Sequence, residues 1–205
     1  MTTLTFYTNP MSRGQIARWM LEEVGAPYEQ VLLEYGTTMK APDYLSINPM
    51  GKVPAIKHGD VVVTEATAIC LYLADAFPTA GLSPDAAARG DYFRWILFAA
   101  GPIEAAITNR AMGWQVPPDK KMMAGYGDFD DAVAVLERAI TGKTFVAGDR
   151  FTAADVYVGA TVDWGLLFGT LPKNAAFEDY IGPLRERAAY KRAKEIDMAL
   201  MPKSD

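Results

Sequence analysis

The stretch 48–67 most constrains what this chain can fold into, because two short apolar runs there flank a turn that contains a glycine. The runs are residues 53–56 and 61–63, and the second is β-branched throughout. This pattern is typical of an antiparallel β-hairpin. Pro54 has no N–H to donate to a β-ladder. We therefore expect it at the start of a strand, where the chain turns sharply and leaves the backbone of Val53 open to a ligand.

A helix is predicted directly after the hairpin, over residues 65–76, because apolar residues recur there at helical spacing. The first N–H groups of a helix lack intrahelical partners and carry partial positive charge, which favours a bound carboxylate. The hairpin would then offer a backbone edge at one end and an anion site just beyond the other. Such a surface fits a small extended peptide with free carboxylates. An ordinary hairpin followed by an ordinary helix is the alternative.

The residues before the hairpin predict a compact βα unit. Residues 4–8 and 28–33 read as strands, and the helix between them could be capped by Ser12 and ended by Gly25. A short helix is expected around Tyr44. The order along the first part of the chain is therefore β-α-β-α-β-β-α.

Turn-forming residues over 77–84 mark a domain boundary, and no strand pattern follows them. We expect one domain over residues 1–78 and an all-helical domain over 85–205. Gly101-Pro102 should kink or break the first long helix of that domain, and Gly182-Pro183 should interrupt the last. Thr152 and Asp155 have the spacing of a capping box. The expected helices cover residues 89–100, 120–140, 152–168 and 175–199.

Composition narrows the class of protein. The chain has 205 residues, of which 50% are hydrophobic, enough to bury a substantial core. Its net charge of −5 argues against a nucleic-acid partner, and no apolar run reaches the roughly 18 residues that span a bilayer. The single cysteine, Cys70, excludes an internal disulfide and is expected to be a small buried hydrophobe. The lone histidine, His58, is expected to be exposed at the turn. The sequence shows no spacing of His, Cys and Asp residues that is typical of a metal site. A cytoplasmic location is the simplest expectation.

Three segments together resemble the cytosolic glutathione transferase superfamily, in particular its bacterial members of the serine or cysteine type. They are Asn-Pro-Met-Gly-Lys-Val-Pro-Ala at 48–55, Glu-Ala-Thr at 65–67 and Phe-Thr-Ala-Ala-Asp at 151–155, in that family's order and spacing. The resemblance implies an α/β thioredoxin-like N-terminal domain followed by an all-α domain. It also implies glutathione as co-substrate, a homodimer, and a cis peptide bond between Val53 and Pro54.

The resemblance also implies which residues would hold glutathione. Glu65 would pair with the γ-glutamyl amine, the Ala66 N–H would bind the neighbouring carboxylate, and the Val53 backbone would pair with the cysteinyl unit as an added strand does. Many family members have serine where Ala66 stands, and Thr67 could replace that hydroxyl in part. The expected glutathione contacts are Lys40, Lys52, Val53, Pro54, Glu65, Ala66 and Thr67.

Catalysis would require a donor that lowers the thiol pKa of bound glutathione. Ser12, just after the first strand, is the predicted donor, with Tyr7 and Asn9 as alternatives. The expected site for the hydrophobic substrate contains Met11, Arg110, Trp114 and Trp164. The predicted reaction joins the glutathione thiolate to an electrophilic hydrophobic small molecule, as in detoxification. Glutathione-dependent peroxide reduction or isomerisation, or a non-catalytic glutathione-binding scaffold, are the alternatives.

Overall fold

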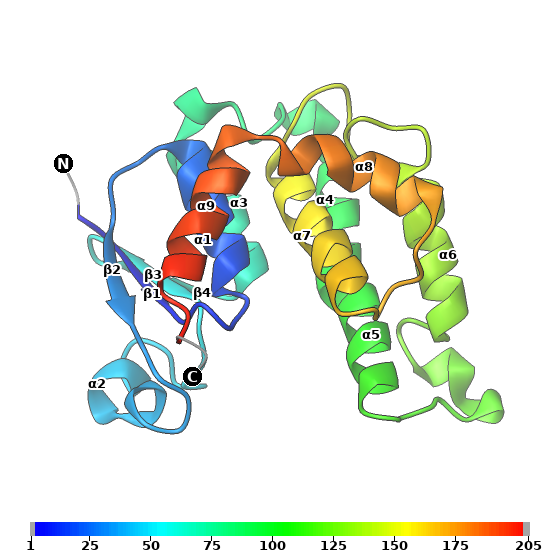
Figure 1. Ribbon diagram of the computed structural model, residues 1–205, viewed down its shortest axis with the longest axis horizontal. Helices are drawn as coiled ribbons and strands as arrows, with labels where there is room; N and C mark the ends of the chain where they lie inside the picture. The colour runs from blue at the N-terminus through cyan, green and yellow to red at the C-terminus, as the bar shows by residue number, and fades with distance from the viewer. Residues whose placement is uncertain (1–2, 203–205) are drawn as a thin grey trace. The chain divides into compact units, whose positions relative to one another are not determined.

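The computed structural model describes residues 3–202, which divide into two compact units (Figure 1). The first contains the residues up to Leu82 together with those from Arg187 onward, and the second is Ser83–Glu186. The sequence placed every residue from 85 onward in the helical domain. The structure instead groups the last helix, α9 (Ala188–Ala199), with the N-terminal residues.

The first unit is built on a four-stranded sheet of order β2-β1-β3-β4. β1 pairs in parallel with β2 and antiparallel with β3, which pairs antiparallel with β4. This arrangement confirms the predicted thioredoxin-like β-α-β-α-β-β-α order. The elements are β1 (Leu4–Thr8), α1 (Gly14–Val24), β2 (Glu29–Leu32), η1 (Thr38–Lys40), α2 (Pro42–Leu45), β3 (Ala55–His58), β4 (Val61–Thr64), α3 (Ala66–Ala76) and η2 (Pro78–Ala80).

The pleat of β1 sends alternate side chains to opposite faces of the sheet. Phe6 is fully buried, and the guanidinium carbon of Arg18 from α1 lies 5.2 Å from its ring centroid. Tyr7 points to the other face, where its ring centroid lies 5.6 Å from that of Tyr44 in α2. The first helix begins against the end of β1, since a Cβ added to Gly14 would lie 2.0 Å from the Thr8 hydroxyl oxygen.

A buried ion pair explains why α9 belongs to the first unit. Arg18 of α1 has no exposed surface, and its Nε donates to Asp197 Oδ1 of α9 at 2.7 Å. The same guanidinium donates to Tyr28 at 2.9 Å and to Gln30 at 2.6 Å. These polar contacts join residues far apart in the chain, and helical periodicity alone gave no indication of them.

The second unit contains helices as its regular elements. The predicted disturbance at Gly101-Pro102 is a π-helical segment, η4 (Ala99–Ile103), through which the chain passes from α4 to α5 without leaving a helical path. Proline lacks the N–H of the regular helical ladder, and a wider turn accommodates that loss. The elements are η3 (Ala86–Ala88), α4 (Arg89–Phe98), η4, α5 (Glu104–Ala111), η5 (Pro118–Met123), α6 (Phe129–Ile140), α7 (Ala153–Leu167) and α8 (Ala175–Arg185).

Two predicted helix limits in this unit are wrong. The helix expected over 120–140 begins only at Phe129, because Asp128 adopts extended backbone and its side chain caps α6 by accepting from the Asp131 N–H at 2.9 Å. The last stretch does not stop at Gly182-Pro183. Pro183 lies near the end of α8, and the interruption falls at Arg187, whose backbone is extended.

The predicted capping box at the start of α7 is confirmed. Asp155 Oδ2 accepts from the Thr152 N–H at 2.9 Å, and Thr152 Oγ1 accepts from the Ala154 N–H at 3.3 Å. Asp155 is fully buried and also accepts from Val146 N and the Tyr180 hydroxyl. The motif therefore links three parts of the helical unit besides capping α7. Across residues 3–202, no helix combines the length and apolar character needed to cross a bilayer.

Candidate glutathione site

The loop before β3 is held by two side chains that converge on one carbonyl. The Tyr44 hydroxyl and Asn48 Nδ2 both donate to the Lys52 carbonyl oxygen, at 2.5 and 2.7 Å. The Val53–Pro54 bond that follows is cis, as predicted. Pairing of β3 with β4 starts only at Ala55, so Val53 precedes the ladder.

A glycine is required in this loop. Gly51 has φ +56°, a left-handed conformation that costs other residues energy, and a Cβ added there would lie 2.6 Å from the Met39 carbonyl oxygen. Its N–H donates to the Asn48 carbonyl at 2.8 Å. The roles of Tyr44 and Asn48 were not predicted from the sequence. Asn48-Pro49 is a turn signal that could have identified Asn48, whereas nothing in the local sequence connects Tyr44 with Lys52.

Glu65 connects β4 to α3 in an unusual conformation. Its φ is +69°, and it is the one non-glycine residue with positive φ among residues 3–202. Such a conformation costs about 1–3 kcal/mol and is often retained at a binding site. Glu65 is exposed, and its carboxylate has no hydrogen-bond or ion-pair partner within the described residues. Ala66, the first residue of α3, is buried, and Thr67 is half-buried.

The antiparallel register brings the two halves of the predicted site together. Because Ala55 pairs with Thr64, the loop residue Val53 and the carboxylate-bearing Glu65 flank the same end of the hairpin. The backbone edge was expected where the hairpin begins along the chain and the anion site just beyond where it ends, and these two chain ends lie next to each other. In an antiparallel pair, the start of one strand lies beside the end of the next.

The loop after β1 carries two of the three candidate donors. Ser12 is 7% exposed, and its hydroxyl donates to the Asn9 carbonyl at 2.6 Å while it accepts from the Gly14 N–H at 2.9 Å. Ser12 therefore accepts from the first N–H of α1, but it is not the predicted cap, because the N-cap position is Arg13, which makes no side-chain cap hydrogen bond. Asn9 is half-buried; Nδ2 donates to the Leu33 carbonyl at 2.8 Å, and Oδ1 accepts from the Met11 N–H at 2.9 Å.

The third candidate donor, Tyr7, is half-buried and packs with Val53 in the cluster on the α2 face of the sheet. Its hydroxyl has no hydrogen-bond partner among the residues that the structure describes. The two candidate lysines differ in their contacts. Lys40 Nζ donates to the Met50 carbonyl at 2.8 Å, whereas the Lys52 side chain is exposed and only its carbonyl is held.

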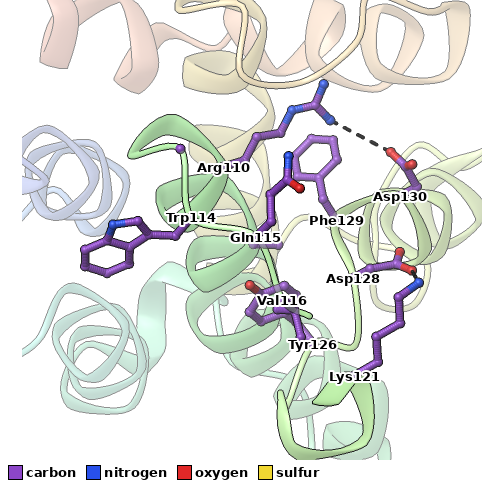
Figure 2. Close-up of a pocket in the computed structure, with 11 residues that line it drawn as sticks. Arg110, Trp114, Gln115, Val116, Lys121, Tyr126, Asp128, Phe129 and Asp130 are labelled. Carbon is purple, nitrogen blue, oxygen red and sulfur yellow. Dashed lines mark hydrogen bonds and ion pairs between the residues drawn. The ribbon is translucent and has the colours of Figure 1, made fainter. Parts of the chain in front are cut away.

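The residues expected to contact the hydrophobic substrate fall in both units. Met11, in the first unit, is 65% exposed. In the helical unit, Arg110 and Trp114 both line a cavity of about 410 Å³, although the Trp114 indole points away from the other labelled side chains (Figure 2). Trp164 of α7 does not line this cavity and packs edge-on against Phe168, with ring centroids 6.2 Å apart.

Two residues that the sequence singled out are structural. His58 is half-buried rather than exposed: its Nδ1 lies 2.9 Å from the Tyr72 hydroxyl, and its ring stacks on Phe77 with centroids 5.6 Å apart. Cys70 is fully buried as predicted, and burial raises the pKa of its thiol. Within residues 3–202, no group of three acidic, histidine or cysteine side chains is placed to hold a metal ion.

Comparison with known proteins agrees with this geometry. Residues 2–75 match the family described as glutathione S-transferase, N-terminal domain. The chain is 32% identical over 162 residues to a probable glutathione S-transferase, GSTF2, of Oryza sativa subsp. japonica, an alignment that covers 71% of this chain and 73% of that protein. It is 28% identical over 168 residues to glutathione S-transferase GST-4.5 of Xanthomonas campestris pv. campestris, covering 78% of this chain and 82% of that one.

Solved structures give the same result over almost the whole chain. A glutathione transferase homologue from Sulfitobacter with bound glutathione superposes with a TM-score of 0.77 at 27% identity, covering 97% of this chain and 100% of that one. A sphingomonad glutathione S-transferase in complex with glutathione gives 0.77 at 26% identity, covering 95% and 98%. The chain belongs to the glutathione S-transferase family.

Proposed function

We propose that this protein is a glutathione transferase that binds glutathione at the Val53–Glu65 end of the hairpin and conjugates it to electrophilic hydrophobic small molecules. The observation that carries the proposal is the convergence at this end of the hairpin. The loop residue Val53, which precedes the ladder, and the Glu65 carboxylate, which has no partner within residues 3–202, lie side by side there. Family membership and the glutathione bound in related structures support the same reading.

The peptide would be held mainly by main-chain groups and one carboxylate. The Val53 backbone would pair with the cysteinyl unit, because a residue outside the ladder retains hydrogen-bonding groups for an added strand. Glu65 would bind the γ-glutamyl amine, and the Ala66 N–H at the start of α3 would bind the adjacent carboxylate, with Thr67 beside it. Lys40 and Lys52 would serve the glycine carboxylate; for Lys40 this means exchanging its bond to a loop carbonyl.

The chemical step needs glutathione as a thiolate. Its sulfur attacks the electrophilic carbon, a new carbon–sulfur bond forms, and the leaving group departs with the bonding electrons. A free thiol has a pKa of about 8.5, so a hydrogen-bond donor at the sulfur increases the thiolate fraction near neutral pH. No metal is required for this step.

Among the three candidate donors, the hydrogen bonds of the loop favour Asn9 over Ser12. The Ser12 hydroxyl has one proton, and that proton is given to the Asn9 carbonyl in a buried loop. The Asn9 amide has a second N–H beyond the one given to Leu33. Ser12 could donate only by breaking a bond that closes the turn, whereas Asn9 could donate without any loss, and Tyr7 remains the third candidate.

Several finer points stay predictions. We expect Met11, Arg110, Trp114 and Trp164 to contribute to binding of the hydrophobic substrate. We also expect a homodimer and a cytoplasmic location, as the resemblance and the composition indicate. Sedimentation at micromolar concentration tests the dimer, and a monomeric mass would exclude it.

Retention on immobilised glutathione and turnover of chlorodinitrobenzene test the function directly. A transferase should show both. Retention without turnover would indicate a glutathione-binding scaffold, and turnover of peroxides alone would indicate a glutathione peroxidase; either result would refute conjugation as the activity.

Three substitutions identify the donor: Asn9→Ala, Ser12→Ala and Tyr7→Phe. We expect Asn9→Ala to lower kcat near neutral pH by about ten- to a hundredfold, with less loss at higher pH, where thiolate is already abundant. Ser12→Ala should mainly cost about 1 kcal/mol of stability, because the loop loses the hydroxyl's bonds to the Asn9 carbonyl and the Gly14 N–H. If Ser12→Ala loses activity while the fold and Asn9→Ala turnover are intact, Ser12 is the donor and the assignment to Asn9 is wrong.

A further inference from the structure

The loop after β1 is linked to the C-terminal helix through one side chain. Gln15, in the first turn of α1, donates from Nε2 to the Pro10 carbonyl oxygen at 2.6 Å. Its Oε1 accepts from Lys194 Nζ of α9 at 3.1 Å. The helix α9 packs along α1 in the same unit (Figure 1), so both contacts lie within one compact body. Two side chains 179 positions apart thus meet beside the loop that carries the candidate donors.

The two partners leave the Gln15 amide a single orientation. A carbonyl oxygen can only accept a hydrogen bond, so the NH2 end of the amide must face Pro10. An ammonium group can only donate, so the amide oxygen must face Lys194. Both side chains are half-buried, and Lys194 Nζ also lies 5.4 Å from the centroid of the Tyr190 ring. The ammonium therefore holds the amide in the orientation that the Pro10 carbonyl requires.

The Pro10 carbonyl belongs to the same peptide group as the Met11 N–H. That N–H donates to Asn9 Oδ1 at 2.9 Å, so Gln15 holds one end of the peptide group and Asn9 the other. Because a peptide group is planar, fixing the direction of its oxygen also fixes the direction of its N–H. The Met11 N–H in turn orients the Asn9 amide, whose Nδ2 donates to the Leu33 carbonyl at 2.8 Å. The direction of the second Asn9 N–H thus depends on how this peptide group is held.

We propose that Gln15 is a positioning residue for the transferase reaction and that Lys194 acts on the reaction through it. Lys194 orients the Gln15 amide, this amide fixes the peptide group after Pro10, and the peptide group directs the donor amide of Asn9. The inference rests on the proposed function with Asn9 as the donor. It adds a role for the C-terminal helix, which lies outside the segments expected to hold glutathione.

The proposal predicts an effect on kcat rather than on binding. Glutathione would be held at the Val53–Glu65 end of the hairpin, which neither Gln15 nor Lys194 contacts within the described residues. A donor displaced by about 1 Å can cost up to about a hundredfold in rate. A purely structural role for the pair predicts a different result, namely a loss of stability in α9 with kcat unchanged.

Steady-state kinetics of the full chain with glutathione and chlorodinitrobenzene, measured across pH, test the proposal. Gln15→Ala should lower kcat about tenfold or more near neutral pH, with little change in the KM for glutathione. The loss should shrink as the pH nears about 8.5, where a free thiol is itself half ionised. Lys194→Met should give a smaller loss of the same kind. In the Gln15→Ala background Lys194→Met should lower kcat no further, because it acts through an amide that is no longer present.

Gln15→Glu separates positioning of the loop from packing of α9. A carboxylate cannot donate to the Pro10 carbonyl, but it can still accept from Lys194. We expect this variant to lose as much kcat as Gln15→Ala while the α9 amides stay as protected from hydrogen exchange as in the wild type. Tyr35→Phe is the matched control, because it removes a hydroxyl that donates to the Met11 carbonyl of the same loop at 3.3 Å. That carbonyl lies in the next peptide group, so kcat should change by less than about twofold.

Three results would each overturn the proposal: unchanged kcat in Gln15→Ala, full kcat in Gln15→Glu, or a further loss from Lys194→Met in the Gln15→Ala background. Asn9→Ala is measured alongside. If it loses turnover while Gln15→Ala does not, the positioning role is wrong and the proposed function stands. If the wild type shows no turnover, the proposed function fails instead. Hydrogen exchange of the Met11 amide then still tests the link, since it should be faster in Gln15→Ala than in the wild type, and equal rates would refute it.

Discussion

Replacing Asp197 by alanine measures what the buried ion pair between α1 and α9 contributes to stability. Arg18 has no exposed surface, and among residues 3–202 Asp197 is its one charged partner at hydrogen-bond distance, at 2.7 Å. Nη1 and Nη2 of the guanidinium each donate to a neutral side chain, Tyr28 and Gln30 respectively. The substitution therefore leaves a buried cation without a counter-charge. Breaking such a pair costs about 3–5 kcal/mol, which corresponds to a fall in Tm of roughly 6–20 °C for a chain of this size.

Urea unfolding followed by far-UV circular dichroism gives the change in free energy, and hydrogen exchange of the α9 amides shows where stability is lost. Glu195→Ala is the matched control, since it removes the same charge from an exposed position of the same helix; it should change stability by less than about 0.5 kcal/mol. Asp197→Asn should lose less than Asp197→Ala, because an amide oxygen can still accept from Arg18. The double variant Arg18→Met with Asp197→Leu should recover most of the loss, because an apolar pair of similar volume carries no desolvation cost.

A loss below about 1 kcal/mol in Asp197→Ala, within the range of an exposed pair, would refute the reasoning. So would a double variant as unstable as the single one. The first result would mean that water or another group compensates Arg18 readily. The second would mean that α9 is held mainly by packing rather than by compensation of charge.

The remaining predictions concern the helical unit, the loop before β3 and the response to alkaline pH. Asp155→Ala should cost about 3 kcal/mol or more in urea unfolding, because Val146 and Tyr180 lose a buried acceptor; a loss of only 1 kcal/mol would reduce its role to the cap alone. Tyr44→Phe should raise the KM for glutathione several-fold with little change in kcat, because the loop loses one of two donors to its carbonyl; an effect on kcat alone would contradict this. Burial and the hydrogen bond to Glu22 raise the pKa of Tyr28 to about 12, so the folded state holds this proton more tightly than the unfolded chain. The stability it contributes is complete below pH 10 and is lost as the pH rises toward 12, and Tyr28→Phe should flatten that part of a stability–pH curve.

Short sequence motifs were sufficient to predict most of the fold. The turn at Gly59, the proline at position 54 and the capping box at Thr152 each determine nearby backbone, and the structure has the expected strand, cis bond and helix start at these positions. The errors arose where one local signal competed with another, or where a contact between distant residues decided the outcome. The helix start expected at 120 was wrong because Asp128 is the better cap, and the position of α9 depends on a pair of residues 179 positions apart in the chain.

The glutathione site could be predicted in its parts but not in its assembly. The segments at 48–55 and 65–67 indicated the family, and the structure brings both to one end of the hairpin. The support for that end could not be read from the sequence, because Tyr44 reaches the Lys52 carbonyl from a separate helix. Positive φ at Glu65 was equally hidden, since no residue preference predicts a left-handed glutamate.

The donor for the thiol shows most clearly why residue type alone was insufficient. A serine at the entrance of a helix is chemically suited to two roles, as a cap and as a donor to a ligand, and one proton cannot serve both at once. In the structure the Ser12 proton closes the turn onto Asn9, and the hydroxyl oxygen receives the Gly14 N–H. The Asn9 side chain uses one N–H to donate to the Leu33 carbonyl and its oxygen to accept from the Met11 N–H, so its second N–H remains available. The expected catalytic role therefore moves from Ser12, whose one proton is already used, to Asn9, which has an N–H to spare. The sequence could not show this, because it does not give the hydrogen-bond partner of each atom.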